Sequence, residues 1–574
     1  MIRRRQPVTD PRALGEGLHP VLRRVYAARG VVSAAELEDG LDRLEPACDL
    51  RGIDAAVDRL AEAVVEGRRI LVVGDFDADG ATSCALAVRA LRAMGAVDPG
   101  YLVPNRFEFG YGLTPEIVEV AAERHPDLLV TVDNGVSSPS GVDAARRRGM
   151  QVIITDHHLP GEALPRADAI VNPNQPGDGF ASKHLAGVGV IFYVMLALRA
   201  RLRETGWFAG AGPREPNMAR HLDLVALGTV ADVVPLDRNN RILVEQGLRR
   251  IRAGHCCAGV AMLMEAAGRN RERATAADLG FGVAPRLNAA GRLDDMSLGI
   301  ECLLSDDPEA ARAVAAELGQ LNRERREIET RMRDEAMAAV DRLHLDCEAP
   351  SLPVGLCLYD EGWHQGVIGI LAARVRERLH RPVIAFAQAG AGELKGSARS
   401  VPGVHIRDLL DAVAAVQPEL ITKFGGHAMA AGLSLPVAHL EAFRSAFDAQ
   451  VRRHMSEDDL YGVVYSDGEL DEHELGLELA EQLRAAGPWG QGFPEPVFDG
   501  RFEVLQRRVV GERHLKLVLR LLGGNGRLDA IAFGALDEGW PLHAARVALA
   551  YRLDVNEYRG ARSAQLVVEH MEEC

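Results

Sequence analysis

The sequence lacks any apolar run long enough to cross a membrane and any paired-cysteine motif. Its longest nearly apolar run, residues 185–198, spans 14 residues, fewer than the ~20 that a membrane-spanning helix needs. The basic N-terminus, MIRRRQPVTDP, is not followed by the apolar core of a secretory signal. None of the eight cysteines forms a C-x-x-C pair, which disfavours a zinc finger and fits a reducing compartment. We therefore expect a cytoplasmic protein without a membrane segment.

Lysine is also scarce, and positive charge is in deficit overall. The 574 residues include 4 Lys and 62 Arg, and the net charge is −16. This balance argues against a basic surface throughout, although it allows a local basic channel. A content of 47% hydrophobic residues is typical of a globular chain, and the length suggests roughly three to five domains.

The most informative stretch is ILVVGDFDADG, residues 70–80. Its continuous apolar run predicts a strand buried on both faces, and Asp75, Asp77 and Asp79 follow before a helix-like stretch that begins after Gly80. A plain polar turn is one reading. An EF-hand is excluded because the twelfth loop position, Leu86, is not Glu. On the remaining reading, the three neighbouring carboxylates repel one another, so they need a cation or abundant water to stay ionised together.

Two later strand-like runs end in the same way. Asp133 and Asn134 follow LLVTV, and Asp156, His157 and His158 follow VIIT. Further strand-like runs are YLV (101–103) and AIV (169–171), with helix-like stretches between most of them. The alternation predicts a doubly wound, mostly parallel sheet, whose strand ends would bring these clusters to one edge.

Asp232 adds an isolated acid within the apolar stretch LVALGTVADVVPL, a costly arrangement unless the acid is paired or metal-bound. Taken singly, these residues also fit turns, a helix cap at Asp156 or a core histidine at His157. Together, the carboxylates and imidazoles suit a pair of divalent ions of the manganese type.

The second half of the chain predicts a highly charged helical connector (306–345), a second α/β unit and a small barrel. Within the α/β unit, Ser397 and Arg399 suit a terminal phosphate. Gly425, Gly426 and His427 are interpreted as a glycine-rich turn entering a small-residue helix, with N–H groups that phosphate could bind. Five short strands after the Pro/Gly-rich segment 486–498 favour an OB-fold.

Two segments suggest contacts with nucleic acid. Residues 501–527 contain seven basic and two acidic side chains, so we interpret Arg507, Arg508, Arg513 and Lys516 as a track for a strand, the alternative being a solvated sheet face. In the loop PNRFEFGYG, Arg106 stands among three aromatic residues, which suits single-stranded nucleic acid but also fits a loop packed on its own domain.

The motifs DFDADG, VDNG, DHH and ADVVPL, in this order, resemble the DHH phosphoesterase superfamily. EGWHQGVIGILAAR, GSARS and GGHAMAAGL resemble its companion DHHA1 domain, and PRLNAAGRL lies between the two sets. The chain is most similar to the single-strand-specific 5′ exonucleases of this superfamily. The resemblance implies an N-terminal helical segment (1–45), a DHH catalytic domain (46–300), a helical connector (301–348), a DHHA1 domain (349–458) and an OB-like domain with its junction (459–574).

The resemblance also implies roles for individual residues. The expected ligands of two ions, Mn²⁺ by preference or Mg²⁺, are Asp77, Asp79, Asp133, His157 and Asp232. Asp75 and His158 are expected to take part in catalysis, Asp75 as a ligand or ligand partner and His158 near the scissile phosphate. The expected substrate contacts are Arg106, Arg286, Asn288, Arg292, His364, Ser397, Arg399, Gly425, Gly426 and His427.

The implied activity is hydrolysis of single-stranded DNA from its 5′ end to 5′-mononucleotides, in recombination and repair. One alternative is a phosphodiesterase of short oligonucleotides or cyclic dinucleotides. A non-enzymatic alternative is a replication scaffold that has kept the fold. Single-stranded DNA with a 5′ end is the expected partner of a monomeric protein, with repair or replication proteins as further candidates.

Overall fold

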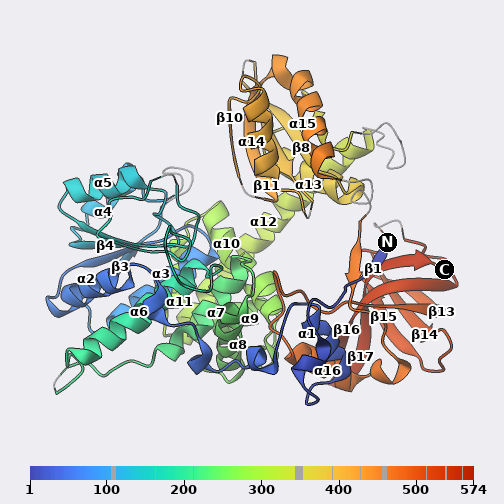
Figure 1. Cartoon of the computed structure of the whole chain (residues 1–574), viewed down its shortest axis with the longest axis horizontal. Coiled ribbons are helices and arrows are strands. Elements are labelled where there is room, and N and C mark those ends of the chain that lie inside the picture. The colour runs from blue at the N-terminus through green and yellow to red at the C-terminus, as the bar shows by residue number, and fades with distance from the viewer. Residues whose placement is uncertain are drawn as a thin grey trace. The chain divides into compact units, whose positions relative to one another are not determined.

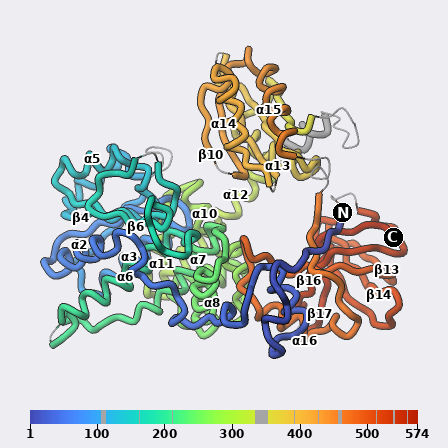
Figure 2. The backbone as a smooth tube through the Cα atoms, viewed as in Figure 1, coloured from blue at the N-terminus to red at the C-terminus, as the bar shows by residue number. Residues whose placement is uncertain are grey.

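The computed structural model describes the chain apart from residues 105–111, 162, 211, 343–352, 391, 402, 427, 456–461, 512, 537–539 and 559. The chain forms two compact units, each assembled from separate stretches of sequence. One unit combines Arg4–Arg323 with Ser466–Cys574, and the other combines Met1–Arg3 with Glu324–Tyr465. Figure 1 labels their elements and Figure 2 traces the backbone.

The larger unit contains an all-parallel sheet with the strand order β3-β2-β4-β5-β6. Ile70 and Val72 of β2 point into one core, whereas Leu71 and Val73 point into another. Both faces are therefore covered, which explains why this strand is apolar at every position. The strands are β2 (Ile70–Val73), β3 (Gly100–Leu102), β4 (Leu128–Val132), β5 (Gln151–Thr155) and β6 (Ala169–Val171).

Helices cover the two faces of this sheet, so the predicted doubly wound α/β fold is confirmed (Figure 1). The helices on one face are α2 (Ile53–Val65), α3 (Ala78–Ala93) and α6 (Gly187–Glu204). Those on the other are α4 (Pro115–Ala122) and α5 (Pro139–Arg147).

The start of α3 differs from the sequence prediction, which placed all three aspartates before the helix. Asp77 is the N-cap, because its side chain accepts a hydrogen bond from the Gly80 N–H at 2.9 Å. Asp79 therefore lies in the first helical turn, where the exposed N–H groups favour a negative charge.

Further helices complete this part of the larger unit and lead out of it. They are α7 (Leu222–Ala231), α8 (Arg238–Arg252), α9 (Ala258–Ala266), the π-helical turn η7 (Asp278–Val283), α10 (Ala284–Leu293), α11 (Ser297–Leu304) and α12 (Pro308–Arg342). Helix α1 (Pro20–Ala27) instead packs against the segment before the barrel, where Tyr26 stacks on Trp489 and Phe493. The predicted charged connector corresponds to α12, a single helix of 35 residues that begins in the larger unit and ends in the smaller one.

The C-terminal part of the larger unit is a closed barrel with the strand order β13-β14-β15-β17-β16. Large aromatic side chains, Phe498, Phe502 and Tyr551, fill its interior, and helix α16 (Leu477–Ala485) packs against β16. The predicted five-stranded barrel is confirmed. Its strands are β13 (Phe498–Val510), β14 (His514–Leu521), β15 (Leu528–Ala532), β16 (Arg546–Tyr558) and β17 (Ala561–Glu573).

The smaller unit contains a mixed sheet with the strand order β10-β11-β9-β8-β7, in which only β7 and β8 pair in parallel. Its strands are β7 (Leu356–Tyr359), β8 (Val383–Gly390), β9 (Glu393–Arg399), β10 (Lys423–Gly426) and β11 (Ala430–Pro436). Its further helices are α13 (Ile368–Leu379), α14 (Ile406–Val416) and α15 (Leu440–His454).

One prediction for the smaller unit is wrong. Gly425 and Gly426 do not enter a helix; they end strand β10, and the small-residue stretch after them is strand β11. Small residues suit this tight antiparallel packing: a Cβ on Gly426 would lie 2.5 Å from the Ala430 carbonyl oxygen. The expected helix N-terminus for phosphate is therefore absent at these described residues.

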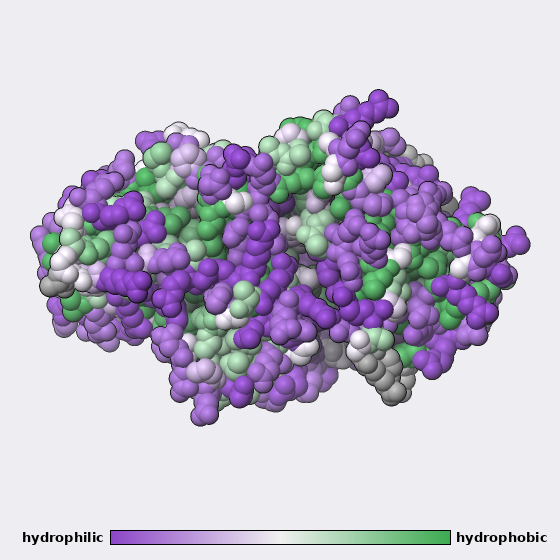
Figure 3. All heavy atoms as spheres, turned by 90° about the horizontal axis from the view of Figure 1, so that it is seen from below, coloured by the Kyte–Doolittle hydropathy of each residue, from purple (hydrophilic) through white to green (hydrophobic). Residues whose placement is uncertain are grey.

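Among the described residues, no helix is both long and apolar enough to traverse a bilayer. Figure 3 shows a face of the protein on which hydrophilic residues predominate and apolar surface occurs in separate patches.

Candidate metal centre

The carboxyl end of β2 leads directly into the first acidic cluster. Asp75 and Asp79 are buried, with 5% and 1% of their surface exposed, whereas Asp77 is half-buried. Gly80 permits this tight turn, because a Cβ there would lie 2.4 Å from the Asp75 carbonyl oxygen. The sequence places glycine where the backbone folds back on itself.

Asp79 is held by the start of helix α6. Its carboxylate accepts the Gly187 N–H at 2.6 Å and the Val188 N–H at 3.0 Å. A Cβ on Gly187 would lie 2.6 Å from the Cβ of Asp133, and one on Gly228 of α7 would lie 2.7 Å from the Asp79 Oδ1. Two helices therefore approach the acids closely because glycine occupies the contact positions.

Asp133 follows β4 with a left-handed backbone, φ 61°, and is 2% exposed. The neighbouring Asn134 donates from Nδ2 to the carbonyl oxygens of Val73 at 3.1 Å and Val132 at 2.9 Å. The Asn134 side chain therefore connects the end of β2 to the end of β4. At both strand ends the backbone leaves the sheet and continues into acidic residues.

Asp156 organises the two histidines after β5. Its Oδ1 accepts hydrogen bonds from the N–H groups of His157 at 2.8 Å and His158 at 3.1 Å, and lies 2.8 Å from the His158 Nδ1. Its Oδ2 accepts the Val136 N–H at 2.9 Å. Asp156 therefore caps the double-histidine turn rather than the following helix that its sequence position suggested.

The separate clusters converge at the carboxyl edge of the parallel sheet. The His157 Nε2 lies 3.1 Å from the Asp133 Oδ1 and 3.5 Å from the Asp232 Oδ2, at the end of α7. Ligand atoms within 4.8 Å of one another form three overlapping groups, namely Asp79/His157/Asp232, Asp133/His157/His158 and Asp75/Asp77/Asp133.

Burial and mutual repulsion make the carboxylates hard to ionise together. Burial, with repulsion from Asp77 next, raises the pKa of Asp75 and of Asp79 to about 7. Burial and repulsion from Asp79 raise the pKa of Asp232 to about 8, and the same two causes raise that of Asp133 well above its ordinary value. A positive charge in their midst would hold all of them ionised.

The two imidazoles differ although they are adjacent. Burial, reinforced by the charge of His158, lowers the pKa of His157 to about 4, so its ring is neutral and able to bind a metal ion. Burial also opposes a charge on His158, but the hydrogen bond and charge of Asp156 outweigh it and raise the pKa of His158 to about 9. The site thus holds a neutral imidazole beside a cationic one.

This donor set fits divalent metal ions of the Mn²⁺ or Mg²⁺ class. Carboxylate oxygens dominate, one neutral imidazole joins them, and no thiolate takes part. The buried Asp75 Oδ1 has no hydrogen-bond partner among the described residues, as expected of an atom that awaits a cation or a bound water. All five predicted ligands belong to these overlapping groups, which also include Asp75 and His158.

The three predicted substrate contacts Arg286, Asn288 and Arg292 all lie on helix α10. The Asn288 Oδ1 accepts the Ala78 N–H at 2.8 Å and so joins α10 to the start of α3. Arg286 donates to the carbonyl oxygens of Gly282 and Ala266 within its own domain, whereas Arg292 is exposed.

In the smaller unit, Ser397 and Arg399 lie on one face of β9. The Arg399 Nη1 donates to the Ser397 Oγ at 3.0 Å, and both side chains face Gly369 of α13. Gly425 pairs with Gly432, and Gly432 pairs with Ser397, so these residues share one rung of the sheet. The His364 Nδ1 accepts the Gly366 N–H at 3.1 Å. Arg106 and His427 lie outside the described residues.

The barrel bears the predicted basic track on the β13–β14 hairpin. Arg508 is directly opposite Lys516, and Arg507, Arg508 and Arg513 are exposed. Arg507 also donates to the carbonyl oxygens of Leu542 at 2.6 Å and Ala544 at 3.0 Å, and the Lys516 Nζ lies 3.9 Å from the Asp529 Oδ2. Part of this charge therefore also holds the barrel together.

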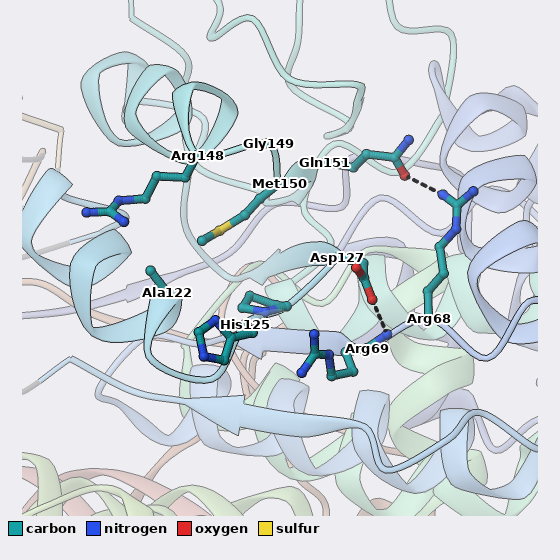
Figure 4. A pocket seen from close by; sticks show the side chains of 10 residues that line it. Arg68, Arg69, Ala122, His125, Asp127, Arg148, Gly149, Met150 and Gln151 are labelled. Atoms are coloured by element: carbon teal, nitrogen blue, oxygen red, sulfur yellow. Dashed lines mark hydrogen bonds between the residues drawn. The ribbon is translucent and has the colours of Figure 1, made fainter.

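Two of the cavities among the described residues lie in the larger unit. One of about 920 Å³ borders Val233, next to Asp232, and extends to Phe281, Trp489 and Arg552. Another of about 490 Å³ lies at the amino ends of β2, β4 and β5, opposite the acidic edge, and is lined by Arg68, Arg69, His125, Asp127 and Arg148 among others (Figure 4). The acids converge at one end of the strands, whereas arginines gather at the other.

Sequence reasoning placed Asp156 at the sheet edge without assigning it a role in the site, and it missed the two asparagines that follow β6. The signal for Asp156 was a run of three polar residues directly after a buried strand. Asn172 and Asn174, in the sequence VNPNQ, follow another predicted strand at the same sheet edge, where the parallel-strand rule also applies.

The chain is similar to known proteins along most of its length. Family models match residues 69–229 (DHH family, N-terminal domain), 353–453 (DHHA1 domain) and 466–570 (RecJ OB domain). The chain is 57% identical over 569 residues to the single-stranded-DNA-specific exonuclease RecJ of Dickeya dadantii, covering 99% of this chain and 98% of that protein.

Solved structures of similar proteins contain divalent metals. The chain is similar to RecJ from Thermus thermophilus in complex with Mn²⁺, with a TM-score of 0.77 at 31% identity over 97% of this chain and 76% of that one. The same protein in complex with Mg²⁺ gives a TM-score of 0.71 at 29% identity, over 97% and 75% of the two chains.

Proposed function

Because the chain belongs to the RecJ family of single-stranded-DNA-specific exonucleases, we propose that it removes 5′-mononucleotides from the 5′ end of single-stranded DNA by means of a two-metal centre. The chain is a metal-dependent exonuclease of single-stranded DNA; the direction of digestion, the products and the role of each residue are the proposal. The observation that carries it is the convergence of buried carboxylates with a neutral imidazole at one sheet edge.

The five ligands in this proposal are Asp77, Asp79, Asp133, His157 and Asp232. Two divalent ions held there would lower the pKa of a bound water and offset the charge of the phosphate. Asp133, whose Oδ1 lies 3.1 Å from the His157 Nε2, would connect the two ligand groups that share it. Asp75 would accept a proton or complete the ligand set, because its Oδ1 has no described hydrogen-bond partner.

His158 has the charge needed to bind the scissile phosphate. Its bond to Asp156 uses Nδ1 and keeps the ring cationic at neutral pH, so we assign Nε2 to a non-bridging phosphate oxygen. A cationic donor forms a stronger bond to an anionic oxygen than a neutral one does.

We assign recognition of the strand end to the smaller unit, and the contact of Arg106 with the substrate remains a separate prediction. Ser397 and Arg399 provide a hydroxyl and a guanidinium side by side, a combination that suits a terminal 5′-phosphate. His364, Gly425, Gly426 and His427 would contact the same nucleotide, and Arg286, Asn288 and Arg292 the strand near the metals. The barrel track of Arg507, Arg508, Arg513 and Lys516 would attract the rest of the strand.

The proposal extends to the cellular setting. We assign the enzyme to DNA recombination and repair in the cytoplasm, as a monomer that meets repair or replication proteins. The family resemblance supports these assignments.

Digestion of end-labelled DNA tests the proposed direction and products. A single-stranded oligonucleotide labelled at either end is incubated with the enzyme and Mn²⁺, beside its duplex. Immediate release of labelled mononucleotide from the 5′ end of the single strand alone is expected. Initial release from the 3′ end would refute the direction, and hydrolysis of only very short oligonucleotides would favour the short-substrate phosphodiesterase.

A further inference from the structure

The turn after β6 carries two asparagine side chains that hold the backbone of both site histidines. The Asn174 Nδ2 donates to the His157 carbonyl oxygen at 2.7 Å, and the Asn172 Nδ2 donates to the His158 carbonyl oxygen at 2.9 Å. Asn172 is 0% exposed. Two consecutive peptide carbonyls are therefore each held by a separate carboxamide.

The turn that presents these carboxamides is itself fixed. The Asn172 Oδ1 accepts the Asn174 N–H at 2.8 Å, and the Asn172 carbonyl oxygen accepts the Gln175 N–H at 3.1 Å. Lys183 donates to the Pro173 carbonyl oxygen at 2.8 Å and to the Asp178 side chain. Both donors are thus oriented by the turn before they meet the histidines.

Asp156 holds the same segment from its other side. It accepts hydrogen bonds from the N–H groups of His157 and His158. The backbone N–H and the backbone carbonyl oxygen of each histidine are therefore both held by side chains that are not predicted ligands. The position of a histidine ring depends on its backbone and two torsion angles. A shift of the His157 backbone would move Nε2, which lies 3.1 Å from the Asp133 Oδ1.

We propose that Asn172 and Asn174 are positioning residues of the metal centre, acting through the backbone carbonyls of the double histidine. This inference rests on the proposed function, because it takes His157 as a ligand and His158 as the phosphate contact. A metal–nitrogen bond tolerates a change in length of only about 0.2 Å. Loss of a side chain that hydrogen-bonds a metal-binding residue typically lowers metal affinity about 10–100-fold. Asn174 fixes the ligand and Asn172 fixes the phosphate contact.

The decisive experiment measures Mn²⁺ binding to the metal-free full-length protein by isothermal titration calorimetry, without DNA. Asn174→Ala removes the donor to His157, so the dissociation constant for Mn²⁺ should rise about tenfold or more. At saturating Mn²⁺, kcat should fall while the KM for DNA changes less than about twofold, since no predicted DNA contact is removed.

Gln175→Ala is the matched control from the same turn. The Gln175 Nε2 donates to the carbonyl oxygens of Arg51 and Ile170, each at 3.0 Å, and to neither histidine. This variant should lower the melting temperature yet keep the Mn²⁺ dissociation constant within about twofold of the unmodified protein. An equal loss of Mn²⁺ affinity in both variants would assign the effect to the turn as a whole and overturn the proposal.

Asn174→Asp provides a second test with an opposite electrostatic expectation. The variant keeps the shape of the side chain but replaces the N–H donor with an oxygen facing the His157 carbonyl. Added negative charge alone would strengthen Mn²⁺ binding, so weaker binding identifies displacement of the histidine. Binding as tight as in the unmodified protein, in either Asn174 variant, would refute the role. Because binding is read without DNA, this result stands apart from any failure of the exonuclease assay.

Discussion

The parallel sheet of the larger unit and the mixed sheet of the smaller unit present their functional residues in different ways. In the parallel sheet, the predicted ligands lie beyond the strand ends or at the end of α7, and are buried or half-buried. In the mixed sheet, Ser397 and Arg399 project from within strand β9. Residues at parallel strand ends meet because of topology alone, whereas residues on a strand face meet only if neighbouring strands pair in the correct register.

Burial separates the two sheets as well. The parallel-sheet acids repel one another in a desolvated site, and their pKa values rise as a result. Ser397 and Arg399 are half-buried and bonded to each other. The first site therefore depends on a cation to remain ionised, whereas the second is already ordered before any anion binds.

Asp133→Asn should have the largest effect, because it weakens the one acid shared by two of the ligand groups. Asn tolerates the left-handed backbone at this position, so the fold should persist. We expect kcat to fall roughly 10³-fold or more, measured by mononucleotide release, with no loss in melting temperature of the metal-free protein.

Asp127→Asn is the control at the opposite edge of the same sheet. The Asp127 Oδ2 accepts the Arg69 N–H at 2.8 Å (Figure 4). Asp127 directly precedes β4, whereas the predicted ligand Asp133 directly follows that strand. The activity of Asp127→Asn should stay close to that of the unmodified enzyme. Comparable inactivation of both variants would contradict the division of labour between the two sheet edges.

Arg399→Ala should weaken recognition of the strand end with a smaller effect. Loss of a charge-assisted hydrogen bond costs about 1.5–3 kcal/mol, so the KM for a 5′-phosphorylated strand should rise about 10–100-fold, and that for a 5′-hydroxyl strand much less. Lys395→Ala, an exposed cation on the same face of β9, is the control. If Lys395→Ala reduced the phosphate preference equally, general charge would explain the effect.

Arg508→Glu should weaken binding of long single strands about fivefold while sparing dinucleotides, because it reverses one charge of the track. The slope of log affinity against log salt should decrease by about 1–2. Arg508 is a better target than Arg507, whose guanidinium also supports two barrel carbonyls. Arg546→Glu, at the start of β16, is the control. If Arg508→Glu weakened the binding of dinucleotides as much as that of long strands, the barrel would have no role in strand binding.

The smallest expected effect is a pH-dependent shift in thermal stability. In the metal-free protein the pKa values of Asp75 and Asp79 are about 7 and that of Asp232 is about 8, against 3.8 for an ordinary Asp. Between these limits the folded state binds more protons than the unfolded state, so its free energy of unfolding falls as pH rises. His158, with a pKa of about 9, contributes in the same direction.

Bound Mn²⁺ removes this penalty, so the rise in melting temperature on adding Mn²⁺ should grow by several degrees from pH 6 to pH 8.5. The lowered pKa of His157, about 4, acts mainly below pH 6.5 and does not oppose the trend in this range. Differential scanning calorimetry with and without Mn²⁺ measures the shift. A constant shift across this range would show that the acids are ionised without metal.

Much of the parallel sheet and its cluster could be predicted because the evidence is local. Apolar runs such as ILVV and LLVTV specify strands by burial, and the acids directly after them follow from strand topology. The smaller unit was harder, since AMAAGLSLP is rich in small residues that fit a helix or a strand. Pairing with β9 and β10 decides for a strand there, and such pairing is not encoded in local composition.

By itself, the sequence determined which side chains can bind metal and that most of them follow the ends of parallel strands, because residue type and strand-end position are local properties. Only the tertiary structure decided how those side chains are held. Asp156 and the Asn172–Asn174 pair hold the backbone of the histidines through hydrogen bonds. Gly187 and Gly228 allow two helices to approach the acids closely. The asparagine and glycine contacts join segments that are distant in sequence. Such contacts depend on packing in three dimensions, which no single segment specifies.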